Sequence, residues 1–284
     1  MVTPASWLSG TVALIAEIPL NPIPFLNSIP VAALAIGVIG LSAGFAFMGV
    51  HVVRRLMRGR VAEGHNDVLA PIFVTAGTIY AVLIGFLVII VWEQYVSTKA
   101  VVADEASALT IMYRQTDGMP TGERQQMRQI LRDYTNAVVN DEWLLQAHGA
   151  TSPRVDAAIS TLYATFGNLE SATADSAINA DFVRNASLVA ANRNKRILQS
   201  EDRFPGVLWF GLMLGGVLVV SMSFLLYMQR LWLHVLMSSA LASLIGVLLF
   251  ILIVLNHPLS GQLAITTHDY QSAQSAFTAV DRGH

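Results

Sequence analysis

The stretch VLAPIFVTAGTIYAVLIGFLVIIVW, residues 68–92, decides the fold class of this chain, because it contains no Asp, Glu, Lys, Arg or His. About 20 apolar residues rising ~1.5 Å each span the ~30 Å hydrocarbon core of a bilayer. Three more stretches are similarly apolar, with at most a single His among the ionisable residues, at residues 30–53, 205–227 and 231–256. The sequence therefore predicts an all-α membrane protein with four transmembrane helices and the lipid bilayer as its surroundings.

The composition narrows the function classes. Of the 284 residues, 54% are hydrophobic and 13% are charged, whereas soluble domains carry about 25% charged residues. A net charge of -2 is not typical of a nucleic-acid-binding protein. The chain has no Cys, and its seven His are scattered, so the sequence indicates no catalytic site, metal site or cofactor. We expect that the protein is not an enzyme.

The four apolar stretches form two hairpins around a polar insert. Residues 30–92 form the first transmembrane hairpin and residues 205–256 the second, in which Gln229 and Arg230 are nearly all that separates the two helices. The insert, residues 93–204, carries most of the charged residues and is predicted to be an extramembrane helical bundle. Two flanking parts remain, which are an apolar N-terminal segment (1–29) and a C-terminal tail (257–284). Because residues 1–29 contain no Lys or Arg, they are not typical of a secretory signal peptide.

The second transmembrane helix is predicted to continue into the insert, because no helix breaker occurs between Gly85 and Gly118. A single helix is expected from about Pro71 to Gln115. Thr121 is the expected N-cap of the next helix, and Thr267 caps a short helix in the tail. The further helices are predicted over residues 122–148, 153–170, 174–199 and 268–280.

Small residues recur at intervals of about four in each transmembrane helix, a spacing that allows close backbone approach in lipid. One interpretation is tight packing within a single four-helix bundle. The other is that one face, that of the second helix, lines a pore or packs between subunits. The predicted helix-packing residues are Gly37, Gly40, Gly44, Gly77, Ala81, Gly85, Gly211, Gly215 and Gly246.

One face of the second helix combines hydroxyl groups, an apolar middle and a terminal carboxylate. The candidate pore-lining residues on this face are Thr75, Thr78, Val82, Ile89 and Glu93. A hydrophobic constriction between polar ends is one way to build a gated ion path. The alternative is that the threonine hydroxyls bond their own helix carbonyls and that Glu93 is an ordinary carboxylate in water.

A basic cluster near the end of the insert could contact lipid phosphates or form ion pairs within the insert. Ion pairing is the favoured interpretation. The cluster consists of Arg193, Lys195 and Arg196, and its candidate partners are Glu105, Glu201 and Asp202.

Three quoted stretches give the chain a family resemblance. They are GFLVIIVWEQYVSTKAVVADEASALTIMYR (85–114), NRNKRILQSEDRFPGVLWFGLMLGG (192–216) and LNHPLSG (255–261). Their order and spacing resemble the bestrophin-like membrane proteins, a family of unknown function found mainly in bacteria. The family commonly has Asp two residues before the Pro of the third stretch, where this chain has Asn256. The resemblance implies four membrane helices, a long helical projection, a homo-oligomer and a remote kinship with bestrophin anion channels.

Two functions follow from these features. The first is an oligomeric ion channel or pore, passing inorganic ions through the inner membrane of the cell. The second is a membrane-anchored helical sensor or scaffold without transport or catalytic activity. The positive-inside rule, which gives long loops less weight, places the insert outside, whereas the bestrophin-like topology places it in the cytosol.

Overall fold

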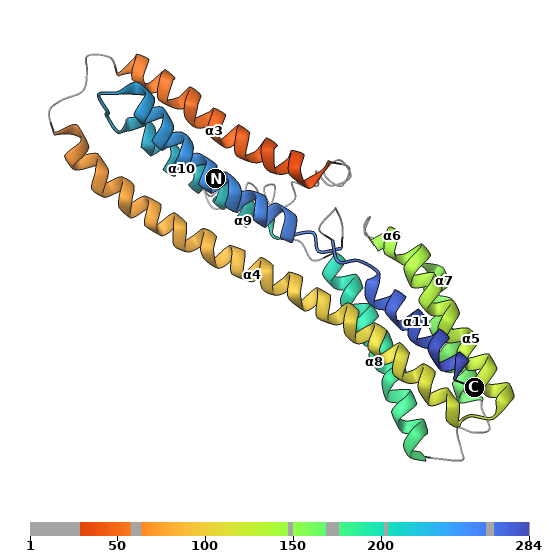
Figure 1. Cartoon of the computed structure of the whole chain (residues 1–284). Coiled ribbons are helices and arrows are strands. Elements are labelled where there is room, and N and C mark those ends of the chain that lie inside the picture. Colours follow the sequence, from red (N-terminus) through yellow and green to blue (C-terminus); the bar gives the residue numbers. More distant parts are fainter. Residues whose placement is uncertain are drawn as a thin grey trace, which may run out of the picture. The chain divides into compact units, whose positions relative to one another are not determined.

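The computed structural model describes residues 29–57, 64–146, 150–168, 176–201, 204–259 and 264–283. Within these ranges every regular element is a helix and no strand occurs (Figure 1). The predicted all-α class is confirmed. The predicted N-terminal segment falls outside the described residues except at its last position.

Four helices are long and apolar enough to cross a membrane, as predicted: α3, α4, α9 and α10. Their bounds are Val31–Leu56 (α3), His65–Gln115 (α4), Gly206–Leu225 (α9) and Leu231–Leu255 (α10). The other helices are η1 (Thr116–Gly118), α5 (Thr121–Ala137), η2 (Val138–Glu142), α6 (Trp143–Gln146), α7 (Pro153–Gly167), α8 (Ser176–Glu201) and α11 (His268–Arg282).

The chain divides into two compact units. Among the described residues, unit 1 contains α3, the part of α4 up to Glu93, α9 and α10, whereas unit 2 contains the rest of α4, α5 to α8 and α11. Helix α4 is continuous from His65 to Gln115. This confirms that the second transmembrane helix continues into the insert, as the absence of breakers predicted.

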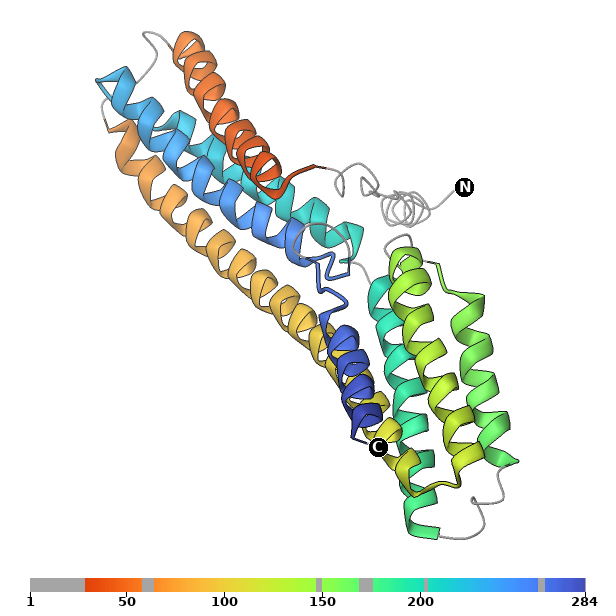
Figure 2. The ribbon, with the colours of Figure 1, turned by 45° about the vertical axis from the view of Figure 1, so that its right-hand side comes forward.

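In unit 1, α3 lies beside both α10 and α9 (Figures 1 and 2). Close approach depends on glycine where α3 meets α10. A Cβ atom placed on Gly246 would lie 2.8 Å from Ser42 Oγ and 3.2 Å from the Cα atom of Ile39. Helices α4 and α9 meet in a similar way, because a Cβ on Gly215 would lie 2.8 Å from Cδ2 of Tyr80. The hydroxyl of Tyr80 donates a hydrogen bond to the Leu212 carbonyl oxygen (3.2 Å).

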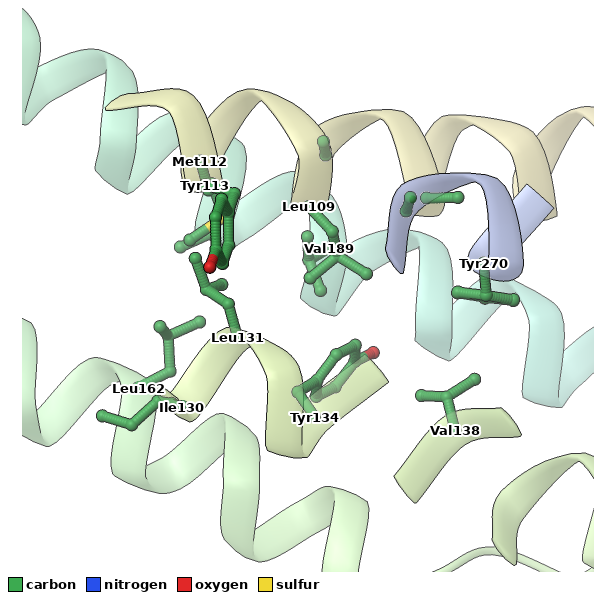
Figure 3. Packing of buried hydrophobic residues seen from close by; sticks show 14 of the residues in the cluster. Leu109, Met112, Tyr113, Ile130, Leu131, Tyr134, Val138, Leu162, Val189 and Tyr270 are labelled. Atoms are coloured by element: carbon green, nitrogen blue, oxygen red, sulfur yellow. The ribbon is translucent and has the colours of Figure 1, made fainter. Parts of the chain in front are cut away.

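Unit 2 has its own apolar core, to which α4, α5, α7, α8 and α11 contribute (Figure 3). The C-terminal helix α11 inserts Tyr270, Ala273 and Phe277 into this core. The ring of Phe277 stacks on that of Tyr113, with centroids 4.2 Å apart. Helix α11 is therefore an integral part of unit 2.

Two details of the predicted insert helices were wrong. Thr121 is the first residue of α5, and Pro120 takes the N-cap position in its place. The helix predicted over residues 122–148 is interrupted by η2, a π-helical turn at Val138–Glu142. Such a turn inserts one extra residue into a helix, and it rotates the face that follows. Residues 147–149 lie outside the described part.

The remaining insert and tail helices follow the sequence signals closely. Helix α7 begins with Pro153 at its first position, where the fixed φ of proline suits a helix. Thr267 occupies the N-cap position of α11 as predicted, although its side chain makes no capping hydrogen bond.

Candidate functional site

The candidate pore-lining residues Thr75, Thr78, Val82, Ile89 and Glu93, called the α4 stripe below, all lie on the exposed surface of the single chain. Val82 and Ile89 are each 54% exposed, and Thr75, Thr78 and Glu93 are exposed as well. The structure therefore places all five residues on one open face and surrounds none of them with other parts of the same unit.

The opposite face of α4 is buried in unit 1. Tyr80, Ile84, Leu87 and Val91 are at most 8% exposed and belong to the apolar core of this unit. Successive residues of an α-helix are about 100° apart, so the centre of this buried set lies roughly 180° from the centre of the α4 stripe. The packing of this opposite face in unit 1 therefore orients the α4 stripe away from the core of the unit.

The two threonine hydroxyls of the stripe bond to their own helix. Thr75 Oγ1 donates to the Pro71 carbonyl oxygen (2.9 Å), and Thr78 Oγ1 donates to that of Val74 (2.8 Å). This is the local pattern expected in membrane helices. Because each hydroxyl proton is used, the surface of the stripe offers hydroxyl lone pairs, and it offers no side-chain cation.

The predicted packing residues fall into two groups. Gly215 and Gly246 are the inward glycines, because a Cβ at either would meet a neighbouring helix of unit 1. A Cβ on the outward glycines would meet no atom within 4 Å; these are Gly37, Gly40, Gly44, Gly77, Gly85 and Gly211. Ala81, on the same side of α4 as Gly77 and Gly85, is also exposed. The outward group has no partner within the described part of one chain.

The sequence reasoning missed one close contact in unit 1. A Cβ on Gly49 would overlap the ring of Phe224, so this ring lies directly against the α3 backbone. Gly49 is five residues after Gly44 and therefore does not continue the four-residue spacing of small residues. The only sequence feature that could have indicated this contact is the presence of a glycine, Gly49, in one transmembrane helix and of a large ring, Phe224, in another.

Large apolar side chains cover much of the outer surface of unit 1. Among the most exposed are Leu41 (77%), Ile36 (72%) and Met48 (68%) on α3, and Ile79 (65%) and Phe86 (63%) on α4. Soluble monomers rarely expose contiguous apolar patches of this kind. These helices meet lipid or other protein, which agrees with their transmembrane character.

Unit 2 contains a buried ionic network that joins three helical segments. Its charged members are Glu105 on α4, Glu142 in η2, and Arg193 and Arg196 on α8, all at most 5% exposed. Arg196 Nε bonds Glu105 Oε2 (3.0 Å), and Arg196 Nη2 bonds Glu142 Oε1 (2.9 Å). Arg193 Nη2 bonds Glu142 Oε2 (2.6 Å). The favoured pairing of the basic cluster with Glu105 is confirmed for Arg196.

The pKa values of Arg196 and Tyr134, two buried members of the network, are both raised, which keeps the arginine charged and the tyrosine neutral. Burial alone would lower the pKa of Arg196, but the neighbouring Glu105 carboxylate raises it well above its usual value. Burial raises the pKa of Tyr134, and the negative charge of Glu105 raises it further. The Tyr134 hydroxyl accordingly stays protonated and donates to Glu105 Oε1 (2.7 Å). The arrangement joins α4, α5 and α8, and it resembles a structural ion-pair network more than a reaction centre.

The other members of the basic cluster divide between burial and exposure. Lys195 is exposed, whereas Arg193 also bonds the half-exposed carboxylate of Asp156 (2.6 Å). The sequence reasoning missed Glu142 and Asp156 as partners. The side chain of Glu201 and the whole of Asp202 lie outside the described residues.

Comparison with known proteins gives a consistent relationship. The family profile described as the bestrophin-like domain matches residues 40–270. Two solved structures of variants of a bacterial bestrophin homolog from Klebsiella pneumoniae have the same fold. For one, the TM-score is 0.69 at 11% identity, over 87% of this chain and 98% of the other; for the second, it is 0.69 at 12% identity, over 86% and 97%. No curated protein matches the sequence.

Proposed function

The chain belongs to the bestrophin-like family, and on this premise we propose that it is an ion channel formed by several copies of itself in a membrane. By kinship with the bestrophin anion channels, anions are the proposed permeant ions. The observation that carries the proposal is the orientation of α4, which buries one face in unit 1 and leaves the α4 stripe on the opposite, open face.

One copy cannot enclose a path along a single exposed helix face. A ring of identical copies, each presenting the same face to a common axis, closes a path without any further protein. The outward glycines and Ala81 favour such a ring, since small residues let helices of neighbouring copies approach closely in lipid. The inner membrane of the cell is the proposed location.

The narrowest part of the path is proposed to lie between Val82 and Ile89. No charged side chain of α4 occurs between Asp67 and Glu93, so an ion in the middle of the path would find no charge to replace its water. Such an apolar constriction opens and closes by wetting and drying. A polar side chain at this level is expected to keep the path wet.

The test is conductance of the purified full chain in planar bilayers and ion flux in liposomes. Ile89→Ser is expected to raise conductance several-fold, because a hydroxyl in the constriction stabilises water there. Ile90→Ser is the matched control, since Ile90 is 52% exposed against 54% for Ile89 and is rotated by about 100° on the helix. Equal changes in both variants, or silence in all of them, would contradict the channel and favour the scaffold.

Glu93 offers a second test at the end of the same stripe. Its carboxylate lowers the local concentration of anions, so Glu93→Gln is expected to increase the permeability of chloride relative to that of sodium. Reversal potentials under a salt gradient measure this ratio. An unchanged ratio would remove Glu93 from the path.

A further inference from the structure

Unit 1 contains a cavity of about 770 Å³ where all four of its helices have an end. Its walls come from the last turns of α3 and α9, the first residues of α4 and α10, and the α9–α10 connection. None of the α4 stripe residues lines it, so it is separate from the proposed ion path. Its volume is in the range of small-molecule sites.

The wall formed by the α9–α10 connection is fixed by side chains from the other two helices. Arg54, at the end of α3, donates hydrogen bonds to the carbonyl oxygens of Met228 (3.3 Å) and Gln229 (3.2 Å). At the start of α4, Asn66 makes two hydrogen bonds with the backbone of Tyr227, at 2.8 and 2.9 Å. The cavity is therefore a built feature of unit 1.

Two histidines of the cavity, His65 and His234, each donate a hydrogen bond to a backbone carbonyl oxygen. His65 Nε2 lies 3.0 Å from the Leu225 carbonyl oxygen, and His234 Nε2 lies 3.0 Å from that of Ser223. Since a carbonyl oxygen only accepts, each of these nitrogens carries a hydrogen. The second ring nitrogen of each histidine takes no part in these bonds.

Among the described residues that line the cavity, arginines outnumber carboxylates. Arg54 and Arg55 line it together with one carboxylate, that of Asp67, and no ion pair joins these three side chains in the described part of the chain. Arg54 donates to neutral carbonyl groups, and the exposed Arg55 has no hydrogen-bond partner among the described residues. Within the described part of the chain, no carboxylate therefore contacts either of these two guanidinium groups.

The position of the cavity identifies the chemistry that reaches it. The apolar spans of α3, α4, α9 and α10 all end at its walls, and lipid headgroups lie where apolar spans end. Basic pockets between transmembrane helices are suited to phosphate headgroups, and the planar guanidinium matches phosphate oxygens with paired donors.

We propose that this cavity binds a phosphate group, held by Arg55 and Arg54 between the ends of α3 and α4. The phosphate comes either from an anionic lipid headgroup or from free phosphate in solution. The proposal does not depend on ion conduction, because the residues that carry it are separate from the α4 stripe.

The test uses the full chain in a neutral detergent. Native mass spectrometry counts bound phosphatidylglycerol, with phosphatidylcholine as the zwitterionic comparison, and thermal unfolding in inorganic phosphate against chloride detects the free anion. Arg55→Gln removes one guanidinium without touching the bonds of Arg54. Arg230→Gln is the matched control, because Arg230 is exposed on the same α9–α10 connection but does not line the cavity.

Retention of phosphatidylglycerol is expected to fall about tenfold in Arg55→Gln, the loss expected for one charge-assisted hydrogen bond, and to change less than twofold in Arg230→Gln. Stabilisation by inorganic phosphate that Arg55→Gln abolishes would add free phosphate as a source, and its absence would assign the site to lipid. Arg55→Lys, which keeps the charge but loses the fork, is expected to be intermediate. Equal losses in Arg55→Gln and Arg230→Gln, or no binding of either probe to the native chain, would overturn the proposal.

Discussion

The two units of this chain use different means to hold helices together. In unit 1, the inward glycines Gly215 and Gly246 let side-chain and backbone atoms of neighbouring helices approach the backbones of α9 and α10 closely. In unit 2, α4, η2 and α8 meet around the ionic network of Glu105, Glu142, Arg193 and Arg196. Every ion pair between described residues lies in unit 2.

We propose that the difference follows from the surroundings in which each unit folds, which are lipid for unit 1 and water for unit 2. In lipid there is no hydrophobic drive between helices, so close contact of backbones takes its place. In water, burial of apolar groups stabilises the helices, and a buried ionic network adds a requirement for specific partners. The comparison therefore predicts that unit 2 is sensitive to loss of charge, and that unit 1 is sensitive to added volume.

Arg196→Met is expected to give the largest effect on stability. The side chain of Arg196 is fully buried, and its loss leaves the carboxylates of Glu105 and Glu142 without a shared partner. Breaking a buried ion pair on one side costs about 3–5 kcal/mol. Thermal unfolding of the full chain, with hydrogen exchange of the α5 and α8 amides, measures the loss.

Lys195→Met is the control for this change. Lys195 is the exposed neighbour of Arg196, and surface substitutions of this kind change stability by about 0.5 kcal/mol or less. Similar losses in the two variants would mean that the cluster acts through its general charge and that the network does not hold unit 2 together.

Gly246→Ala is expected to give the next largest effect, and it tests unit 1. The new Cβ would lie 3.2 Å from the Cα atom of Ile39, so α3 and α10 must move apart. Overpacking of this kind costs roughly 1–3 kcal/mol. The measurement is thermal unfolding in detergent.

Gly211→Ala separates close packing from a general effect of glycine loss. A Cβ on Gly211 meets nothing within 4 Å, and alanine is favoured over glycine in a helix by up to about 1 kcal/mol. The variant is expected to be as stable as the native chain or slightly more stable. A destabilised Gly211→Ala with an unaffected Gly246→Ala would reverse the assignment of inward and outward glycines.

Asp281→Asn is expected to give a smaller effect, at the end of α11. The Asp281 carboxylate accepts hydrogen bonds from the Tyr113 hydroxyl (2.8 Å) and Arg128 Nη1 (3.0 Å), and it pairs with Arg132. Because its side chain is 28% exposed, solvent screens part of the charge, and a loss of about 1 kcal/mol is expected. Faster hydrogen exchange confined to α11 would confirm it, and uniform exchange across unit 2 would contradict it.

The sequence predicted the helices well where apolar residues form long uninterrupted stretches. Hydropathy located four spans, and the absence of breakers predicted the continuity of α4 through Glu93. The pairing of Arg196 with Glu105 could be anticipated because both lie in the polar insert, where arginines and carboxylates of neighbouring helices can form ion pairs.

The misses have a common physical origin. The π-turn at η2 was not predicted, because one extra residue barely disturbs an apolar pattern of period 3.6, and Glu142 was missed with it. The division of glycines was also beyond the sequence. A four-residue spacing gives the face that allows close approach, but it does not say which neighbour fills it, so Gly246 and Gly85 look alike until the chain is folded.

Gly85→Leu is expected to have the smallest effect on the chain itself and thus sharpens the comparison most. Gly85 is exposed, and a Cβ there meets no atom within 4 Å, so we expect the single chain to accommodate the substitution, which also removes a glycine that weakens the helix. If copies pack through the outward glycines, the same side chain separates them. Helix content by circular dichroism is expected to stay constant while the oligomer seen by native mass spectrometry is lost. Ile79→Phe adds bulk at a 65% exposed position of α4, about 120° away, and should leave the oligomer intact. An oligomer that survives Gly85→Leu would place Gly85 against lipid and leave the ring without its proposed contact.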